Sequence, residues 1–400
     1  MGEKIAMGFH VCVDYELQWD TEIMESLIRS YDIHDAELKM KHDPDSERSA
    51  VIACLAYLKA GVGCEMVPET SEICENFANH FEYRITIGGT ASRAAIAISK
   101  LGYSSALQAC CYNEYIRDLL PDRIKLFSSI GTDHTAVYPH VVLQCAGGVH
   151  IQANDIDFVT PRENRVMLSR DIDSIEMYVS VDFAPMIRDA EVFLLSCFSE
   201  VLDRDILEDR LKSTRQLLET LPENALVVAE DGHYIKEELR HLVHQSLSSV
   251  VDILSMNEDE LQEYIGRRID ILNAETVLKA LEYTAEQSGF STILVHSSKW
   301  AVSYGKLSGI MESALEGGIN MAATRFRLGD EFGEEDYEET GRLTDSESGW
   351  DFCDQLRELA GDKICCLPCK DMGYVKVPTV VGLGDFFAGG LLPGLLIENR

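Results

Sequence analysis

One short stretch near the carboxyl terminus places a single acid between a glycine turn and an apolar run. In "YVKVPTVVGLGDFFAGGLL", residues 374–381 read as a strand, Gly382–Gly384 as a tight turn, and Asp385 as the start of a helix. Backbone amides at such a turn and the helix dipole together form a cradle for phosphate oxygens. An aspartate beside that cradle suits a general base that accepts the proton of an attacking hydroxyl. The structural alternative is that Asp385 only caps the helix.

A second pattern, "MNEDEL", follows the apolar run 249–256. Asn257 and Glu260 have the spacing of a capping box, and a helix is expected to begin there. Carboxylates at the end of a strand also suit a hydrated Mg²⁺, which keeps several waters and takes few protein ligands. Glu230 closes "ALVVAE" at another strand end, either as an ordinary loop residue or as part of the same site. The pattern leaves both interpretations open.

The segment "IGGTASRAAIAISKLG" (87–102) is a second glycine turn that opens a helix. Gly88 and Gly89 would let a ligand approach the backbone. Arg93 lies at the helix start, and Arg165 and Arg170 lie further along the chain. Each of these arginines is either a surface charge or a bidentate phosphate ligand.

The elements that must position these residues alternate between short apolar strands and amphipathic helices. Runs that are apolar on both faces and are separated by helices indicate a parallel sheet covered on each side. Ligands collect at the carboxyl ends of such strands. Those ends carry Ser196, Glu230, Asn257 and His296, which we expect at one edge. Strands are predicted over 191–198, 225–230, 249–256 and 291–298, and helices over 203–221 and 273–289.

Two further regions differ from this pattern. Residues 139–182 contain shorter, alternating, hairpin-like stretches, including 175–183, which predict a small β-rich lid. Residues 329–349 are acidic and punctuated by glycine, which predicts a solvated loop.

Composition limits the classes of function. The 400 residues exceed what one compact core usually holds, so a large and a smaller domain are expected. The formal net charge of −33 argues against nucleic-acid and anionic-membrane partners, but a phosphorylated small molecule needs only a few local cations. The amino terminus lacks the pattern of a signal peptide, and no apolar run reaches about 18 residues.

Twelve scattered cysteines favour reduced thiols and a cytoplasmic protein. The group "ICCLPCK" has no second cysteine pair with zinc-like spacing, so structural thiols are predicted there.

In this order, the motifs resemble the ADP-dependent glucokinase and phosphofructokinase family of the ribokinase-like superfamily. The resemblance runs from "FHVCVDYEL" to "VVGLGDFFAGG", nearly the whole chain. It implies an α/β fold, with a ribokinase-like parallel-sheet domain over 1–14, 86–138 and 183–400. A smaller lid domain would span 15–85 and 139–182.

The resemblance also implies roles for single residues. "VGLGDFFAGG" matches the Gly-x-Gly-Asp signature, which implies that Asp385 is the catalytic base. The turn Gly382–Gly384 and its amides, including that of Leu383, would form the anion hole. "MNEDEL" matches the Asn-x-x-Glu motif, and "VAE" resembles His-x-Glu. The metal residues implied for Mg²⁺ are Asn257, Glu260 and Glu230. The substrate residues implied are Asp14, Gly88, Gly89, Thr90, Asn164 and Arg165.

Four positions depart from the family pattern. Cys12 stands where Asn is common, Thr90 where Asn or Gln follows the glycine pair, Val228 where His precedes the acid, and Phe386 where a small residue follows the base.

The function implied is transfer of the β-phosphate of Mg-ADP to a hydroxyl of a hexose or hexose phosphate by a monomer or small homo-oligomer. The alternatives are an ATP-dependent carbohydrate or nucleoside kinase of the same superfamily and a non-catalytic nucleotide or sugar sensor.

Overall fold

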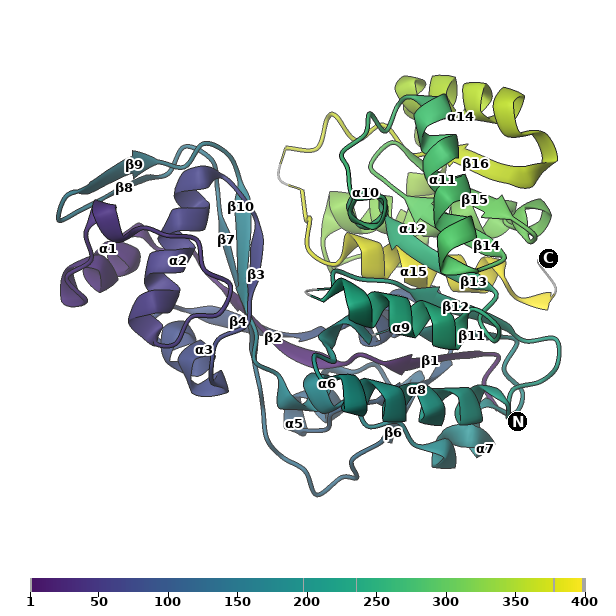
Figure 1. Cartoon of the computed structure of the whole chain (residues 1–400), viewed down its shortest axis with the longest axis horizontal. Helices are drawn as coiled ribbons and strands as arrows, with labels where there is room; N and C mark the ends of the chain where they lie inside the picture. The colour runs from purple at the N-terminus through teal and green to yellow at the C-terminus, as the bar shows by residue number, and fades with distance from the viewer. Residues whose placement is uncertain (1, 197, 235, 377, 398–400) are drawn as a thin grey trace.

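The structure is a computed structural model that describes residues 2–196, 198–234, 236–376 and 378–397. It contains two separate sheets, each with its own helices. The chain passes between the two sheets at several points (Figure 1). No helix in the described part of the chain is both long and apolar enough to cross a bilayer.

The larger sheet has nine strands, and the seven from β14 to β6 run parallel. In the sheet, β1 lies between β11 and β5. The chain adds β5 and β6 on one side of β1 and later adds β11 to β14 on the other side, so the strand order reverses at β1. Its strands, in spatial order, are β16 (Ile364–Pro368), β15 (Trp300–Gly305), β14 (Thr292–His296), β13 (Ile253–Asn257), β12 (Leu226–Glu230), β11 (Val192–Leu195), β1 (Ile5–Phe9), β5 (Ser105–Ala109) and β6 (Ile124–Ser128).

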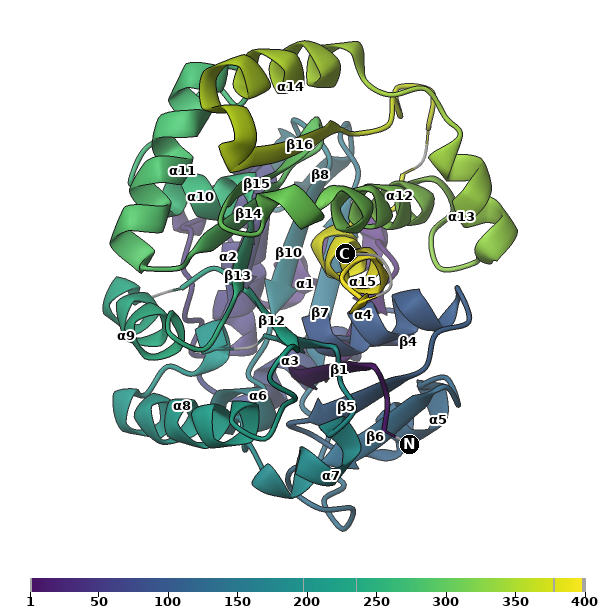
Figure 2. The ribbon, with the colours of Figure 1, turned by 90° about the vertical axis from the view of Figure 1, so that its right-hand side faces the viewer.

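Helices cover both faces of this sheet (Figure 2). Each face has its own apolar core, because the central strands bury side chains on both sides. One core includes residues of α8 (Arg204–Leu218), α9 (Glu237–Leu247), α10 (Glu258–Tyr264), α11 (Ala274–Ser288) and α14 (Glu347–Ala360). The other includes residues of α4 (Thr90–Ser99), α5 (Glu114–Leu119), α12 (Glu312–Leu328) and α15 (Leu383–Gly394).

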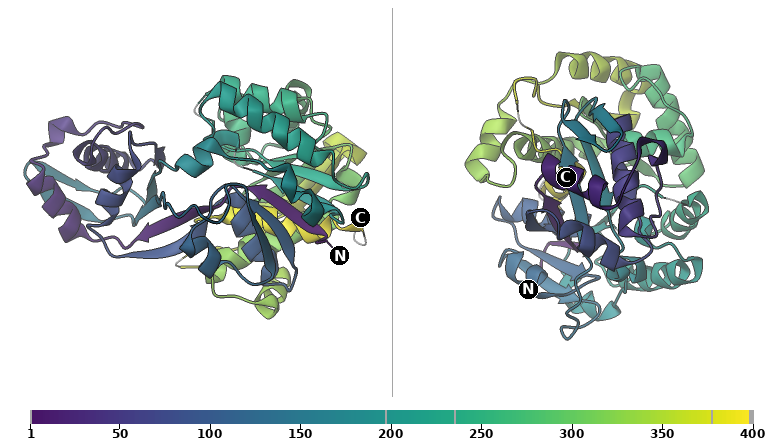
Figure 3. Two further views of the ribbon diagram at one scale, coloured as in Figure 1. Left: turned by 90° about the horizontal axis from the view of Figure 1, so that it is seen from below. Right: turned by 90° about the vertical axis from the view of Figure 1, so that its left-hand side faces the viewer.

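The smaller sheet has five strands with helices packed on one face (Figure 3). The order is β3 (Cys64–Met66), β10 (Asn164–Leu168), β7 (His140–Cys145), β2 (Cys12–Leu17) and β4 (Tyr83–Gly88). Apolar residues of α1 (Thr21–Ser30), α2 (Glu47–Ala60), α3 (Ser71–Ala78) and the hairpin β8 (His150–Ala153)–β9 (Ile156–Val159) form its core. The opposite face of the smaller sheet borders the space beside the larger sheet.

The chain passes between the two sheets four times, from β1 to β2, from β4 to β5, from β6 to β7 and from β10 to β11. Short α6 (Ile172–Glu176) and α7 (Ala184–Ile187) lie on the last connection. The domain boundaries given above stay a prediction.

The structure confirms the α/β class and the strands and helices predicted between residues 190 and 300. Three local predictions are wrong. Residues 374–376 and 378–381 form no strand, 175–183 contain only the end of α6 and a short 3-10 turn over 181–183, and 329–349 contain α13 (Glu334–Gly341) and the start of α14. Cys197 and Val377, which fall within predicted strands, lie outside the described residues.

The last helix, α15, depends on close packing against α12. A Cβ at Gly390 would overlap the carbonyl of Gly317 and would lie 2.5 Å from Cβ of Met321, so the two backbones cross with no room for a side chain. α15 is otherwise strongly apolar, with Leu391 and Leu392 fully buried. This crossing fixes where the amino terminus of α15 can lie.

We expect Gly390→Ala to lower the free energy of unfolding by about 1–3 kcal/mol, the usual cost of overpacking. Urea denaturation measures it. The matched control is Gly309→Ala, where the added Cβ meets nothing within 4 Å. Equal stability of the two variants would contradict this description of the crossing.

Candidate functional site

Three polar side chains predicted to share an edge do lie together. Glu230 and Asn257 end β12 and β13, and His296 ends β14 directly beside Asn257 in the register. The Nε2 atom of His296 is 3.3 Å from Oε1 of Glu230. Its ring stacks on Phe387 of α15, with centroids 4.4 Å apart. The strand ends therefore meet the first turn of α15.

α15 begins as predicted for an anion cradle. Gly382 has a φ of 70°, a conformation that glycine adopts without strain, and the helix starts at Leu383. The amides of Leu383, Gly384 and Asp385 belong to the first turn, where the helix itself supplies no acceptor. No side-chain cap is formed by the N-cap residue, Gly382.

Asp385 is the third helical residue, and it contacts residues of α4. The hydroxyl of Thr90 donates a hydrogen bond to Oδ1 of Asp385 at 2.8 Å. Nε of Arg93 lies 3.8 Å from Oδ2. The side chain keeps 24% of its surface exposed, so it remains accessible to solvent. The simple helix-cap explanation of this residue is wrong, because its carboxylate binds another element.

Arg93 is a buried cation between two predicted site acids. Its Nη2 donates to Oδ2 of Asp14 at 2.6 Å, and both side chains are at least nine-tenths buried. Burial lowers the pKa of Arg93, but the negative charges of Asp14 and Asp385 outweigh it and raise that pKa overall. A Cβ at Gly382 would overlap Nη1 of Arg93, so the glycine is needed for this approach. Arg93 is therefore neither a surface charge nor free for a phosphate.

The glycine pair serves close contacts within the chain. A Cβ at Gly88 would overlap the carboxylate of Asp14. Gly89 has a φ of 90°, and a Cβ there would come within 2.5 Å of the carbonyl oxygen of His10. The sequence could have indicated the importance of Arg93, because it is a charge among alanines that must pack closely.

The predicted metal residues form an acidic cluster at the ends of β12 and β13. Glu260 Oε2 accepts from the amide of Asn257 at 2.9 Å, which confirms the capping box. Oε2 of Glu230 is buried and has no hydrogen-bond partner. Burial, and then the charges of Glu230 and Asp231, raise the pKa of Glu260 well above its usual range. Buried, mutually repelling oxygen donors fit a hydrated divalent cation.

Two other predicted residues lie on the smaller sheet, beside a cleft of about 640 Å³. Asn164 Nδ2 donates to the carbonyls of Tyr57 and Val62, so its amide holds the turn after α2. Arg165 is 3.4 Å from Glu65. Across the cleft, the larger unit contributes Asp259, Glu263 and His233. Arg93 does not join Arg165 in this cleft.

Comparison with known proteins was made at the level of family and of fold. A family model described as the ADP-specific Phosphofructokinase/Glucokinase conserved region matches residues 3–340. The chain belongs to this ADP-specific phosphofructokinase/glucokinase family. None of the curated proteins matches it.

Solved structures of similar proteins share the fold. A phosphofructokinase from Pyrococcus horikoshii OT3 with AMP superposes with a TM-score of 0.78 at 17% identity, covering 98% of each chain. An ADP-dependent kinase in complex with fructose-6-phosphate and ADPβS gives 0.75 at 14% identity, covering 99% of this chain and 94% of the other. The ribokinase-like α/β fold, with a smaller β-rich unit, is thus confirmed.

Membership makes the protein an ADP-dependent phosphotransferase that acts on sugar hydroxyls. The family match ends at residue 340 and so does not include α15 or Asp385. These elements lie within the part of the chain that the structural similarity covers.

We expect Arg93→Met to lower the free energy of unfolding by about 3–5 kcal/mol, because it leaves Asp14 buried without its partner. Asp14→Asn removes the opposite charge. In a double-mutant cycle measured by urea denaturation, the double variant should lose less stability than the two single variants added together. Strict additivity would mean that the two side chains do not interact.

Proposed function

We propose that the protein transfers the β-phosphate of Mg-ADP to a hydroxyl of a hexose or hexose phosphate and releases AMP. The observation that carries the proposal is the placement of Asp385. It is a partly exposed carboxylate in the first turn of α15, held by Thr90, and His296 links this helix to Glu230 at the strand ends. A base, an anion cradle and a cation site on one edge suit phosphoryl transfer to an alcohol.

In this proposal, Asp385 accepts the proton of the acceptor hydroxyl as that oxygen attacks the β-phosphorus. The bond from the β-phosphorus to the bridging oxygen breaks, and that oxygen leaves with AMP. Amides of Leu383, Gly384 and Asp385 donate to the transferring phosphoryl oxygens, where charge develops. The hydroxyl of Thr90 orients the carboxylate through its hydrogen bond, a role different from the sugar contact that the resemblance implied.

The acceptor would lie between the two sheets. Asp14 lies on β2 of the smaller sheet, and the Gly88–Thr90 turn leads from β4 of the same sheet into α4. Asn164 and Arg165 lie on β10, also in the smaller sheet. Asp14 is held by Arg93, which fixes the direction of its carboxylate.

Glu230, Glu260 and Asn257 would hold Mg²⁺ largely through water. A bound Mg²⁺ offsets the negative charge of the nucleotide phosphates. Asp231 adds a further carboxylate to this cluster, since its charge acts on Glu260. Val228 stands where the family pattern has a histidine, and its side chain is fully buried in the apolar core. This position therefore supplies no polar side chain to the site.

Phe386 does not crowd the proposed base. It is 1% exposed and packs toward Phe332, and the guanidinium of Arg325 lies 4.1 Å from its ring centre. The large side chain therefore fills a core on the side of α15 that faces α12.

We expect AMP release from ADP with at least one acceptor from a panel of sugars and sugar phosphates. Asp385→Asn should lower kcat by about 10²- to 10⁴-fold, the usual contribution of a general base, and should keep ADP affinity. Asp351→Asn, an exposed acid on α14, is the matched control and should behave as the unmodified protein.

Coupled detection of AMP, with ATP as the competing donor, measures the transfer. Near-normal turnover by Asp385→Asn would refute the assignment of the base. Faster transfer from ATP would favour the ATP-dependent alternative, and nucleotide binding without transfer to any acceptor would favour the sensor.

We further expect chelation of divalent cations by EDTA to abolish AMP release. Glu230→Gln should raise the Mg²⁺ concentration needed for half-maximal rate by about 10- to 100-fold, as loss of an outer-shell partner does. Mg²⁺ should raise the thermal midpoint of unfolding because it binds the folded state, and this rise should be smaller for Glu230→Gln than for the unmodified protein. Glu286→Gln on the exposed face of α11 is the control, and an equal effect of both variants would contradict the assignment.

A further inference from the structure

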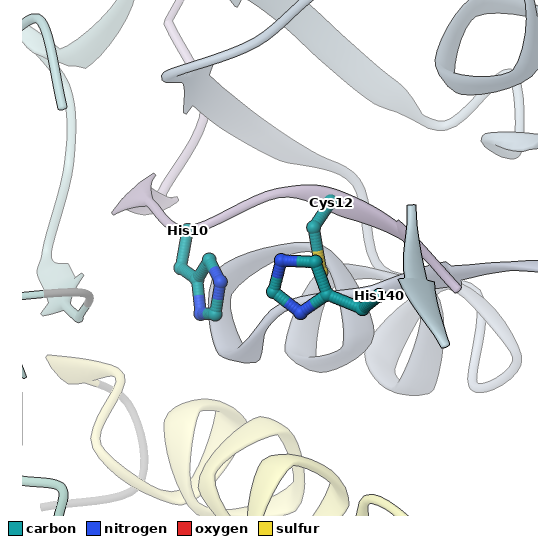
Figure 4. A group of neighbouring side chains, drawn as sticks. All are labelled: His10, Cys12 and His140. Atoms are coloured by element: carbon teal, nitrogen blue, oxygen red, sulfur yellow. The ribbon is translucent and has the colours of Figure 1, made fainter. Parts of the chain in front are cut away.

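Two histidines and a cysteine converge where the chain crosses between the sheets. One ligand atom from each of His10, Cys12 and His140 can be chosen so that all three lie within 4.8 Å of one another (Figure 4). Among the described residues, this is the only such group of three or more potential metal ligands. It lies on the smaller-sheet side of β1, away from the acidic cluster of Glu230 and Glu260.

We propose that His10, Cys12 and His140 form a binding site for a thiophilic divalent cation, with Zn²⁺ as the best fit. Two imidazoles and one thiolate are ligands that Zn²⁺ prefers and Mg²⁺ does not. Three protein ligands leave the fourth tetrahedral position for water or a hydroxyl.

The surroundings of each ligand support this assignment. Nε2 of His10 is buried and has no hydrogen-bond partner, which is a cost unless something else binds there. One nitrogen of His140, Nε2, lies 3.2 Å from Oδ2 of Asp171, which leaves Nδ1 for a metal. A carboxylate on the far nitrogen is the usual support of a metal-bound histidine.

Cys12 donates its thiol hydrogen to a neighbouring acid, and a bound cation would have to displace this hydrogen bond. Sγ of Cys12 lies 3.5 Å from Oδ1 of Asp14, and the thiol is 2% exposed. Binding of a cation would replace the thiol proton, which passes to solvent, and the Zn²⁺–thiolate bond would form in its place. Cys12 is also the position at which the sequence departs from the asparagine of the family pattern.

The distances require a modest contraction. Zn–N and Zn–S bonds of about 2.0–2.3 Å place tetrahedral ligand atoms about 3.3–3.7 Å apart. The present separations are all within 4.8 Å, a limit wider than these values. Rotation of the His10 side chain can supply the difference, because its ring nitrogen Nε2 has no hydrogen-bond partner among the described residues.

A cation here would have two effects. His10 and Cys12 lie on the first connection between the sheets, and His140 ends the third, so the ion would tie two of the four connections together. It would also lie next to Asp14. If the proposed function is correct, Zn²⁺ would therefore compete with the sugar acceptor.

The test uses the full chain and Co²⁺ as a spectroscopic substitute for Zn²⁺. We expect one bound ion per chain and a near-ultraviolet thiolate-to-Co²⁺ charge-transfer band. Cys12→Ser should abolish that band, and His10→Asn should weaken binding by at least about tenfold. Competition with Zn²⁺ should displace the Co²⁺.

Cys64→Ser is the matched control, because Cys64 lies 3.3 Å from His42 and forms the other close cysteine–histidine pair on the smaller sheet. Loss of the band in Cys64→Ser and its retention in Cys12→Ser would overturn the proposal, as would binding without the band. The readout needs no kinase activity, so failure of the proposed function leaves it unaffected. Should Cys12→Ser fail to fold, His10→Asn alone decides, because Nε2 of the partly exposed His10 ring has no hydrogen-bond partner in the described part of the chain.

Discussion

The buried ion pair of Arg93 and Asp14 is the interaction on which the site depends. A guanidinium removed from water is tolerated only when carboxylates surround it, and here Asp14 and Asp385 supply them. The two acids come from opposite ends of the chain, so the pair fixes β2, α4 and α15 relative to one another. Gly382 makes this possible, because any side chain there would occupy the space of the guanidinium.

Two groups of opposite charge lie at this edge of the sheet, and a ligand can balance each of them. The first turn of α15 has amides to which the helix itself supplies no acceptor and a positive dipole end, and the carboxylates of Glu230 and Glu260 repel each other. The magnesium nucleotide proposed as the donor would satisfy both, since its phosphates suit the amides and its cation suits the acids. His296 lies between them, in contact with Glu230 and stacked on Phe387. This complementarity explains how a strongly acidic protein can use a phosphorylated donor.

Much of the architecture was predictable because its signals are local. The strands β11–β14 are apolar on both faces, and α8 and α11 have clear helical periodicity. The errors arose where local signals are weak. The segment 374–381 is rich in valine and threonine, but its described residues, 374–376 and 378–381, pair with no strand. The acidic segment 334–341 becomes helical when Tyr337 packs beside Phe386 and Ala97.

The sequence by itself determined the α/β class, the strand ends that carry Glu230, Asn257 and His296, and the motif around Asp385, because periodicity and caps depend on near neighbours. Only the tertiary structure decided that Arg93 is buried between Asp14 and Asp385, that Thr90 binds the carboxylate, and that His10 and Cys12 meet His140. Those contacts join residues far apart in the chain. They depend on how four connections between two sheets are arranged, which no local pattern contains.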